Sequence, residues 1–297
     1  MSKPVVLITS ATSKNGSATA KLLLETGNYS VRLGSRDPTK LQALIDEGAE
    51  AVELNASPES AAAALKGVSC LYIIIPSLRA GPQTAIIENY LRIATQNGVK
   101  HVIYLSDINV NCEDHFAPVH DHYKHQELVR NSTLPFTILQ PAWFHENTVI
   151  YHGDSVKYSG AFYTCAGDGV WTSVAVQDIA AVAAAIIEDP GAHAGKIYKL
   201  QAEVLTDDML AEKLTKATGK TVRHVNSTPE EYVGFLKSQF GDALEDAFVN
   251  GILRLDEAKR ENRFAEVGPD LERILGRKGV SVDAFLAERA AAFSMPA

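Results

Sequence analysis

Residues 4–16, Pro4-Val-Val-Leu-Ile-Thr-Ser-Ala-Thr-Ser-Lys-Asn-Gly16, lie near the start of this 297-residue chain and give the clearest indication of its fold class. Its first half is a run of apolar and β-branched residues, which predicts a buried strand. A polar turn follows, and Ala18, Leu22, Leu23 and Leu24 then give an apolar face to a helix that we expect to run from about Asn15 to Gly27. Buried strand, short turn and amphipathic helix together predict the first part of a βαβ unit.

The same alternation continues to about residue 142. Residues 70–75 (Cys-Leu-Tyr-Ile-Ile-Ile) are the most hydrophobic segment, which is typical of a central parallel strand covered by helices on both faces. Helical patterns separate this run from the other expected strands, which are 29–34, 51–52, 101–105 and 135–139. Six strands alternating with helices predict an α/β fold with a doubly wound, parallel Rossmann sheet.

The pattern changes after Pro141. We expect aromatic and glycine-rich turns over 143–169, followed by helices at 177–188 and near 206–218, 228–239 and 283–293. The sequence therefore predicts a Rossmann dinucleotide-binding domain at 1–142 and a smaller C-terminal α/β lobe at 143–297 that binds the substrate.

Composition excludes several classes of protein. A formal net charge of −8 argues against a nucleic-acid partner, because such proteins concentrate lysine and arginine. No apolar run suggests a membrane span and no secretory signal is visible. Three scattered cysteines, Cys70, Cys112 and Cys165, suit a reducing compartment and inert thiols. We expect a cytoplasmic protein.

The turn after the first strand has the position of a phosphate-binding loop. Such loops place three glycines at spacings of three, for a tight turn, a close approach to the pyrophosphate and helix packing. Here Ser10, Ser13 and Gly16 occupy those places, so only the last is glycine. One interpretation keeps a phosphate site, with serine hydroxyls and helix amides as donors. The other is a serine-capped strand-to-helix turn with no ligand.

The end of the second strand favours the phosphate site. Gly34-Ser-Arg36-Asp-Pro38 places a cation where an NAD-binding protein has an acidic residue for the ribose 2′-hydroxyl. An arginine there suits the 2′-phosphate of NADP(H), and Lys40 stands one helical turn further on. A solvated surface arginine is the alternative.

These segments resemble the NmrA-like family of atypical short-chain dehydrogenases. The resemblance rests on 8–16, on Arg36-Asp-Pro38, on 97–106 and 134–141, on Trp143-Phe-His-Glu-Asn147, and on 176–179 and 195–198. It implies an NADP(H)-binding Rossmann fold, with members that reduce quinones, imines and other conjugated compounds and others that are non-catalytic redox sensors. It also implies that the segment Trp143–Asn147 closes over the nicotinamide. Ser10 and Ser13 depart from the glycines of the family's turn.

Catalytic candidates come from the fifth strand and the next helix. A short-chain dehydrogenase uses a tyrosine and a lysine four residues later, but Tyr123 immediately precedes Lys124, and adjacent helix residues do not share a face. His120 and Lys124 do share one, so we expect Lys124 to position the ribose and His120 to donate a proton, with Ser106 nearby. The cofactor-binding residues that we expect are Ser10, Thr12, Ser13, Lys14, Asn15, Gly16, Arg36, Lys40, Asn55, Pro76, Lys124, Trp143, Phe144 and Asn147.

The cluster of histidines in this region is only weak evidence for a metal site. His115, His120, His122 and His125 are close in sequence, but they lack a firm ligand pattern, and solvated histidines explain them better.

Three functions stay open. The first is an NADPH-dependent reductase of a small conjugated molecule of the quinone, imine or enone type. The second is an NADP-sensing or redox-inert regulator that binds a protein partner, favoured by the missing glycines and tyrosine. The third is a non-redox isomerase or cyclase that uses His120 or Asp107 for proton transfer.

Overall fold

The structure of the chain, a computed structural model, describes residues 2–75, 82–110, 117–241, 246–263 and 265–294. The chain forms two compact units. Unit 1 comprises Met1–Pro141, Val176–Leu200 and Arg273–Gly276, and unit 2 comprises Ala142–Ala175, Gln201–Glu272 and Arg277–Ala297. Unit 1 thus includes 176–200, which the sequence pattern had assigned to the C-terminal lobe.

The centre of unit 1 is a parallel sheet with the strand order β10-β6-β5-β4-β1-β2-β3. The order reverses at β1, which pairs with both β2 and β4, so the expected doubly wound Rossmann sheet is confirmed. Its strands are β1 (Val5–Ile8), β2 (Ser30–Ser35), β3 (Glu50–Glu53), β4 (Val68–Ile73), β5 (His101–Leu105), β6 (Phe136–Pro141) and β10 (Lys196–Leu200).

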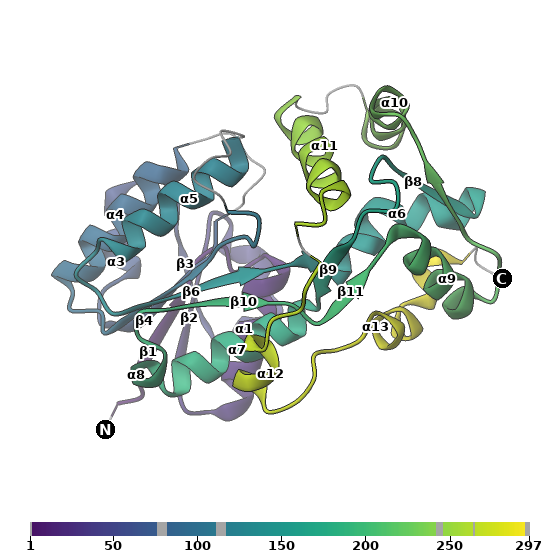
Figure 1. Cartoon of the computed structure of the whole chain (residues 1–297). Coiled ribbons are helices and arrows are strands. Elements are labelled where there is room, and N and C mark those ends of the chain that lie inside the picture. The colour runs from purple at the N-terminus through teal and green to yellow at the C-terminus, as the bar shows by residue number, and fades with distance from the viewer. Residues whose placement is uncertain (1, 76–81, 111–116, 242–245, 264, 295–297) are drawn as a thin grey trace. The chain divides into compact units, whose positions relative to one another are not determined.

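Helices cover both faces of this sheet (Figure 1). On one face α1 (Lys14–Thr26) packs along α7 (Val176–Glu188), and on the other lie α3 (Pro58–Ala64), α4 (Gln83–Gln96) and α5 (Ala117–Arg130). Two short helices complete the unit, α2 (Gln42–Asp46) and α8 (Pro190–His193). Coverage on both faces explains why Leu71, Tyr72 and Ile73 of β4 are fully buried.

The seventh strand joins the sheet through α7. This alanine-rich helix buries Ile179, Val182 and Ile186, and β10 then pairs in parallel with β6. Because α7 and β10 form a strand–helix crossover of the same kind as those before residue 142, residues 176–200 belong with the Rossmann sheet.

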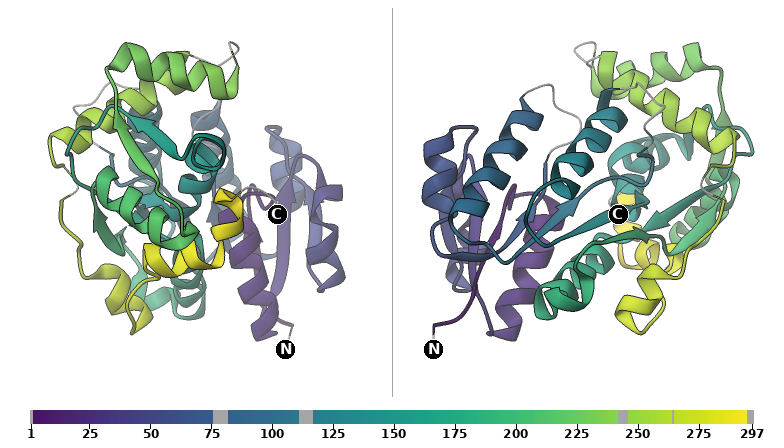
Figure 2. Two further views of the ribbon diagram at one scale, coloured as in Figure 1. Left: turned by 90° about the vertical axis from the view of Figure 1, so that its right-hand side faces the viewer. Right: turned by 60° about the vertical axis from the view of Figure 1, so that its left-hand side comes forward.

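Unit 2 is built around two small sheets and several helices, seen from two further directions in Figure 2. Its strands are β7 (Trp143–Phe144), β8 (Ala161–Thr164), β9 (Trp171–Val174), β11 (Glu203–Leu205) and β12 (Arg223–Asn226). Its helices are α6 (His145–Ser159), α9 (Asp207–Thr218), α10 (Pro229–Phe240), α11 (Asp246–Arg260) and α13 (Val282–Glu288), while α12 (Asp270–Leu275) extends across a boundary of the two units. Within the part of the chain that the structure describes, none of the helices is long and apolar enough to cross a membrane.

The expectation of turns throughout 143–169 was wrong, because α6 occupies fifteen residues of that range. The helix buries a stripe that contains Thr148, His152 and Val156, at helical spacing. Its aromatic and glycine content masked this period in the sequence.

The turn between β1 and α1 is held by a close approach of backbone to backbone. A Cβ added at Gly16 would lie 2.8 Å from the Cα of Ala11 and 2.9 Å from the carbonyl oxygen of Ser10. Both are backbone atoms, so no side-chain rotation relieves the clash. Glycine is therefore required at this place in the turn.

We predict that Gly16→Ala lowers the free energy of unfolding by about 1–3 kcal/mol, because the turn and the helix must separate to admit the methyl group. Gly153→Ala is the matched control, since its Cβ would meet no atom closer than 3.8 Å in the middle of α6. Denaturant unfolding of both variants measures the difference. Equal stability of the two would contradict the assigned role of Gly16.

Candidate functional site

The turn after β1 lies where the carboxyl ends of three strands come together. The Thr9 hydroxyl donates to the Ile74 carbonyl at 2.9 Å and accepts from the Ile74 amide at 2.8 Å, which ties the end of β1 to the end of β4. The Ala11 amide donates to the Gly34 carbonyl at 3.0 Å, so the turn also contacts β2. The turn thus stands at the topological switch point, where doubly wound sheets bind ligands.

The first turn of α1 presents polar groups at this point. Ser13 is the N-cap, and its hydroxyl accepts from the Gly16 amide at 3.1 Å. Thr12 and Lys14 are exposed. Asn15 is only 4% exposed, and its Oδ1 has no hydrogen-bond partner among the described residues. The helix N-terminus attracts an anion, and Asn15 adds a buried acceptor that a bound donor would satisfy.

Ser10 adopts a backbone conformation that glycine adopts more easily. Its φ of +47° lies in the left-handed region, which costs a residue with a Cβ about 1–2 kcal/mol. The carbonyl of Ser10 accepts from the Ser13 amide at 2.9 Å and closes the turn. The turn therefore contains one left-handed residue, a conformation that glycine would adopt without this cost.

Two cations follow β2, and they differ in their surroundings. Lys40 lies 3.7 Å from the carboxylate of Asp37, which also accepts from the Thr39 amide. Arg36 is exposed and makes no hydrogen bond or ion pair with any described residue. Its guanidinium is thus the freer of the two for an anionic ligand.

Asn55 already uses its side chain within the protein. Its Nδ2 donates to Glu53 at 3.0 Å, and its Oδ1 accepts from the Ser57 amide at 2.8 Å. To bind a cofactor, Asn55 would have to give up these hydrogen bonds. Its role in cofactor binding stays a prediction. Pro76 lies outside the described residues.

These observations fit a nicotinamide dinucleotide at the switch point. The tight backbone contact at Gly16, the amides that begin α1 and the unpartnered Asn15 Oδ1 suit a pyrophosphate and its attached sugars, and Arg36 suits a phosphate on the ribose.

Ser106, at the end of β5, is buried and tied to α5. Its hydroxyl accepts from Gln126 Nε2 at 2.6 Å, and Gln126 Oε1 accepts from Gln140 at 3.1 Å. Lys124 is exposed on α5. His120 lies in the same helix, but its side chain is outside the described residues. The proposed pairing of His120 with Lys124 therefore stays a prediction.

The expectation that His122 and His125 are solvated was wrong. They are 7% and 2% exposed, and their Nδ1 atoms lie 2.8 Å and 3.1 Å from the hydroxyl of Tyr104 on β5. Burial lowers the pKa of each imidazole to about 4, so both are neutral near pH 7. The shared face of these histidines was visible in the sequence, but the buried tyrosine that binds them was not.

Three expected residues belong to unit 2. Trp143 packs its ring against Tyr151, with centroids 5.5 Å apart. Phe144 stands at the N-cap position of α6, and Asn147 lies in the first turn of that helix. Their role at the nicotinamide remains a prediction.

Comparison with known proteins identifies the family. A family model described as NAD(P)H-binding matches residues 10–190. The chain is 30% identical over 275 residues to quinone oxidoreductase 2 of Escherichia coli (strain K12), covering 92% of this chain and 94% of that protein. It belongs to the NAD(P)H-binding, NmrA-like family of atypical short-chain dehydrogenases.

Solved structures agree with this assignment. The NADPH-dependent quinone oxidoreductase of Escherichia coli, complexed with NADPH, has a TM-score of 0.84 and 25% identity over 96% of this chain and 99% of that one. The negative transcriptional regulator NmrA, in complex with NADP, has a TM-score of 0.78 at 14% identity, over 97% of this chain and 95% of that one. The likeness to NmrA shows the fold alone.

We predict that His122→Asn flattens the acid limb of the stability profile. The wild-type imidazole takes up a proton at about pH 4 when folded but near pH 6.5 when unfolded, so stability falls as the pH drops through this window. Asparagine keeps a polar atom near Tyr104 and does not titrate. The slope of unfolding free energy against pH between 6 and 4.5 should decrease by roughly 1.4 kcal/mol per pH unit. An unchanged slope would show that His122 is protonated in the folded protein.

Proposed function

We propose that this NmrA-like protein is an NADPH-dependent reductase of a small conjugated molecule of the quinone, imine or enone type. The observation that carries the cofactor preference is Arg36, an exposed guanidinium without a partner among the described residues, directly after β2. The relative of Escherichia coli named as a quinone oxidoreductase supports the reaction class.

In this proposal the turn after β1 binds the pyrophosphate of the cofactor, and residues that follow it in the chain orient the rest of the cofactor. The amides of α1 hold the pyrophosphate, and Asn15 Oδ1 accepts from a hydroxyl of the bound nucleotide. Arg36 binds the 2′-phosphate through paired N–H donors. NADPH supplies a hydride when bound. Lys124 is assigned to the ribose, and His120 to proton delivery.

An NADP-sensing regulator is the second candidate, and one observation favours it. The hydroxyl of Ser13 occupies the Gly16 amide, which a phosphate would otherwise engage. An internal competitor of this kind weakens cofactor binding, and weak binding suits a protein that responds to nucleotide concentration. Binding of NADPH without consumption in the presence of quinones, imines and enones would favour the regulator.

We predict that Arg36→Ala weakens NADPH binding by about tenfold to a hundredfold and leaves NADH binding unchanged, because only NADPH carries the 2′-phosphate. Fluorescence titration of the two cofactors measures this. Arg92→Ala, which removes an exposed arginine from α4, is the control and should leave both affinities as they are. Equal losses of affinity for NADH and NADPH would contradict a contact between Arg36 and the 2′-phosphate.

We predict that the double variant Ser10→Gly/Ser13→Gly binds NADPH about tenfold more tightly than the natural chain. Glycine at position 10 relieves the left-handed strain, and glycine at position 13 frees the Gly16 amide. Calorimetric titration with NADPH provides the measurement. Weaker binding would instead mean that the serine hydroxyls themselves contact the cofactor.

A further inference from the structure

Unit 2 contains a cavity that the Rossmann sheet does not explain. Both tryptophans of the chain, Trp143 and Trp171, line it, together with the rings of Tyr151 and Tyr232. Its free volume of about 20 Å³ accommodates a group about the size of a water molecule. The cavity is therefore suited to a single polar head group with aromatic neighbours.

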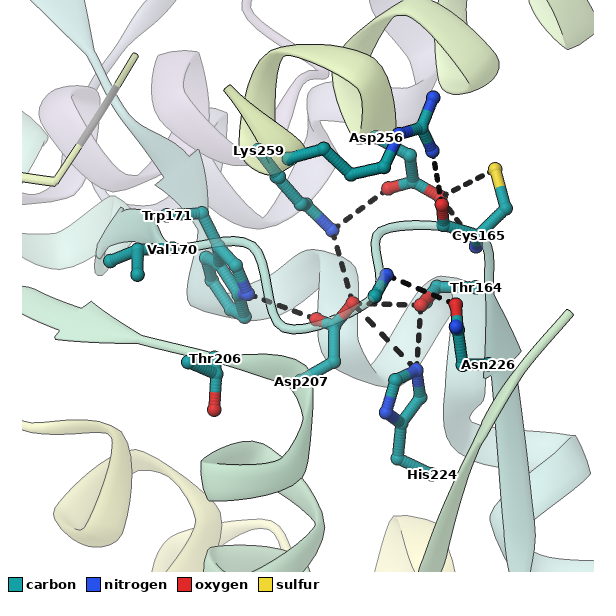
Figure 3. A network of polar contacts seen from close by, with 12 residues as sticks. Thr164, Cys165, Val170, Trp171, Thr206, Asp207, His224, Asn226, Asp256 and Lys259 are labelled. Carbon is teal, nitrogen blue, oxygen red and sulfur yellow. Dashed lines mark hydrogen bonds and ion pairs between the residues drawn. The ribbon is translucent and has the colours of Figure 1, made fainter. Parts of the chain in front are cut away.

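Three buried charged residues line this cavity, and Figure 3 shows the contacts among them. Lys259 Nζ lies 3.0 Å from Asp256 Oδ1 and 3.6 Å from Asp207 Oδ2. The side chains of Lys259, Asp256 and Asp207 are 8%, 2% and 1% exposed. Two carboxylates thus lie beside one ammonium at a site shielded from water.

The charged forms of these residues are held in place by their partners. Burial alone would raise the pKa of Asp207, but Lys259 and the hydroxyl of Thr164 bring it below its usual value. Burial alone would lower the pKa of Lys259, but Asp207 and Asp256 raise it. The indole N–H of Trp171 also donates to Asp207, at 2.9 Å. Asp207 and Lys259 are therefore ionised near neutral pH.

The arrangement of these residues is preformed, because the C-terminal end of α11 is fixed against the turn between β8 and β9. A Cβ added at Gly169 would lie 2.5 Å from the carbonyl carbon of Lys259. Arg260 donates to the carbonyl of Cys165, and the Val170 amide donates to Asn262 at 3.1 Å. These contacts fix the end of the helix that carries Asp256 and Lys259.

His152 on α6 supplies a separate sign of a ligand. It lines the cavity and is 7% exposed, and its Nδ1 has no hydrogen-bond partner among the described residues. Burial lowers the pKa of this imidazole to about 4, so it is neutral and offers one acceptor nitrogen. A buried nitrogen without a partner is costly, which indicates that a hydrogen-bonding group belongs in the cavity.

The groups that line the cavity select the ligand. An anion would meet two carboxylates at close range, whereas a cation meets carboxylate oxygens, an imidazole acceptor and aromatic faces. The ammonium of Lys259 already makes such a cation–π contact, since its Nζ lies 5.2 Å from the centre of the Trp171 ring.

We propose that the unit 2 cavity binds the ammonium head group of a small organic amine through Asp256, His152 and the surrounding aromatic rings. This inference uses residues of unit 2 alone. It is independent of the proposed binding of NADPH in unit 1, and either can fail without the other.

The tryptophans make the test direct, because both line the cavity and no other residue of the chain has an indole ring. The full-length protein is titrated with methylammonium and benzylammonium chloride at constant ionic strength. Methanol and benzyl alcohol are the neutral matches. We expect saturable changes in tryptophan fluorescence with the amines, at affinities at least tenfold tighter than with the alcohols. Equal responses to both series, or no response to either amine because the cavity holds a structural water only, would overturn the proposal.

Variants locate the site. Asp256→Asn should weaken amine binding at least tenfold, whereas Asp283→Asn, which removes a carboxylate that pairs with Lys216 on the surface of unit 2, should leave it unchanged. If thermal unfolding shows that the Asp256→Asn protein is not folded, His152→Phe is tested in its place. This variant should weaken amine binding about threefold to tenfold, because the acceptor nitrogen is lost. Unaltered affinity in a folded Asp256→Asn or His152→Phe protein would overturn the proposal.

Discussion

The contact of Gly16 with the backbone of Ser10 and Ala11 is the constraint on which the candidate site depends. It brings the start of α1 directly over the end of β1, with no room for a side chain between them. Thr9 then joins β1 to β4, and Ala11 joins the turn to β2. The amides of α1 are consequently aimed at the point where the strand order reverses, which is where doubly wound sheets bind nucleotides.

Two serines, Ser10 and Ser13, form part of this turn. Ser10 accepts a left-handed conformation, and Ser13 caps the helix with its hydroxyl. The cap stabilises α1 and at the same time engages an amide that a phosphate would use. Capping of α1 and binding of a phosphate at this turn would therefore compete for the same amide donor.

The cavity of unit 2 is lined by buried charged side chains, whereas the candidate site of unit 1 is formed mainly by backbone groups. Asp207, Asp256 and Lys259 come from the start of α9 and from α11, and their mutual attraction opposes the cost of removing them from water. Losing one partner would leave a buried charge unpaired. The same requirement orders the residues around the cavity, including Trp171 and Thr164, whose donors point at Asp207.

The Rossmann sheet could be predicted from local patterns alone, because each strand and helix of residues 4–141 carries its own period and ends at its own turn residues. The sequence also placed the turn at 9–16 and Arg36 directly after β1 and β2, while their binding of a phosphate stays a prediction. Local patterns did not show that β10 completes the sheet, that α6 is a helix or that His122 and His125 are buried against Tyr104. Nor did they show that Asp207 pairs with Lys259, more than fifty residues away. The physical reason is that these features depend on contacts between distant segments, and no local pattern encodes which buried partner a polar side chain will find.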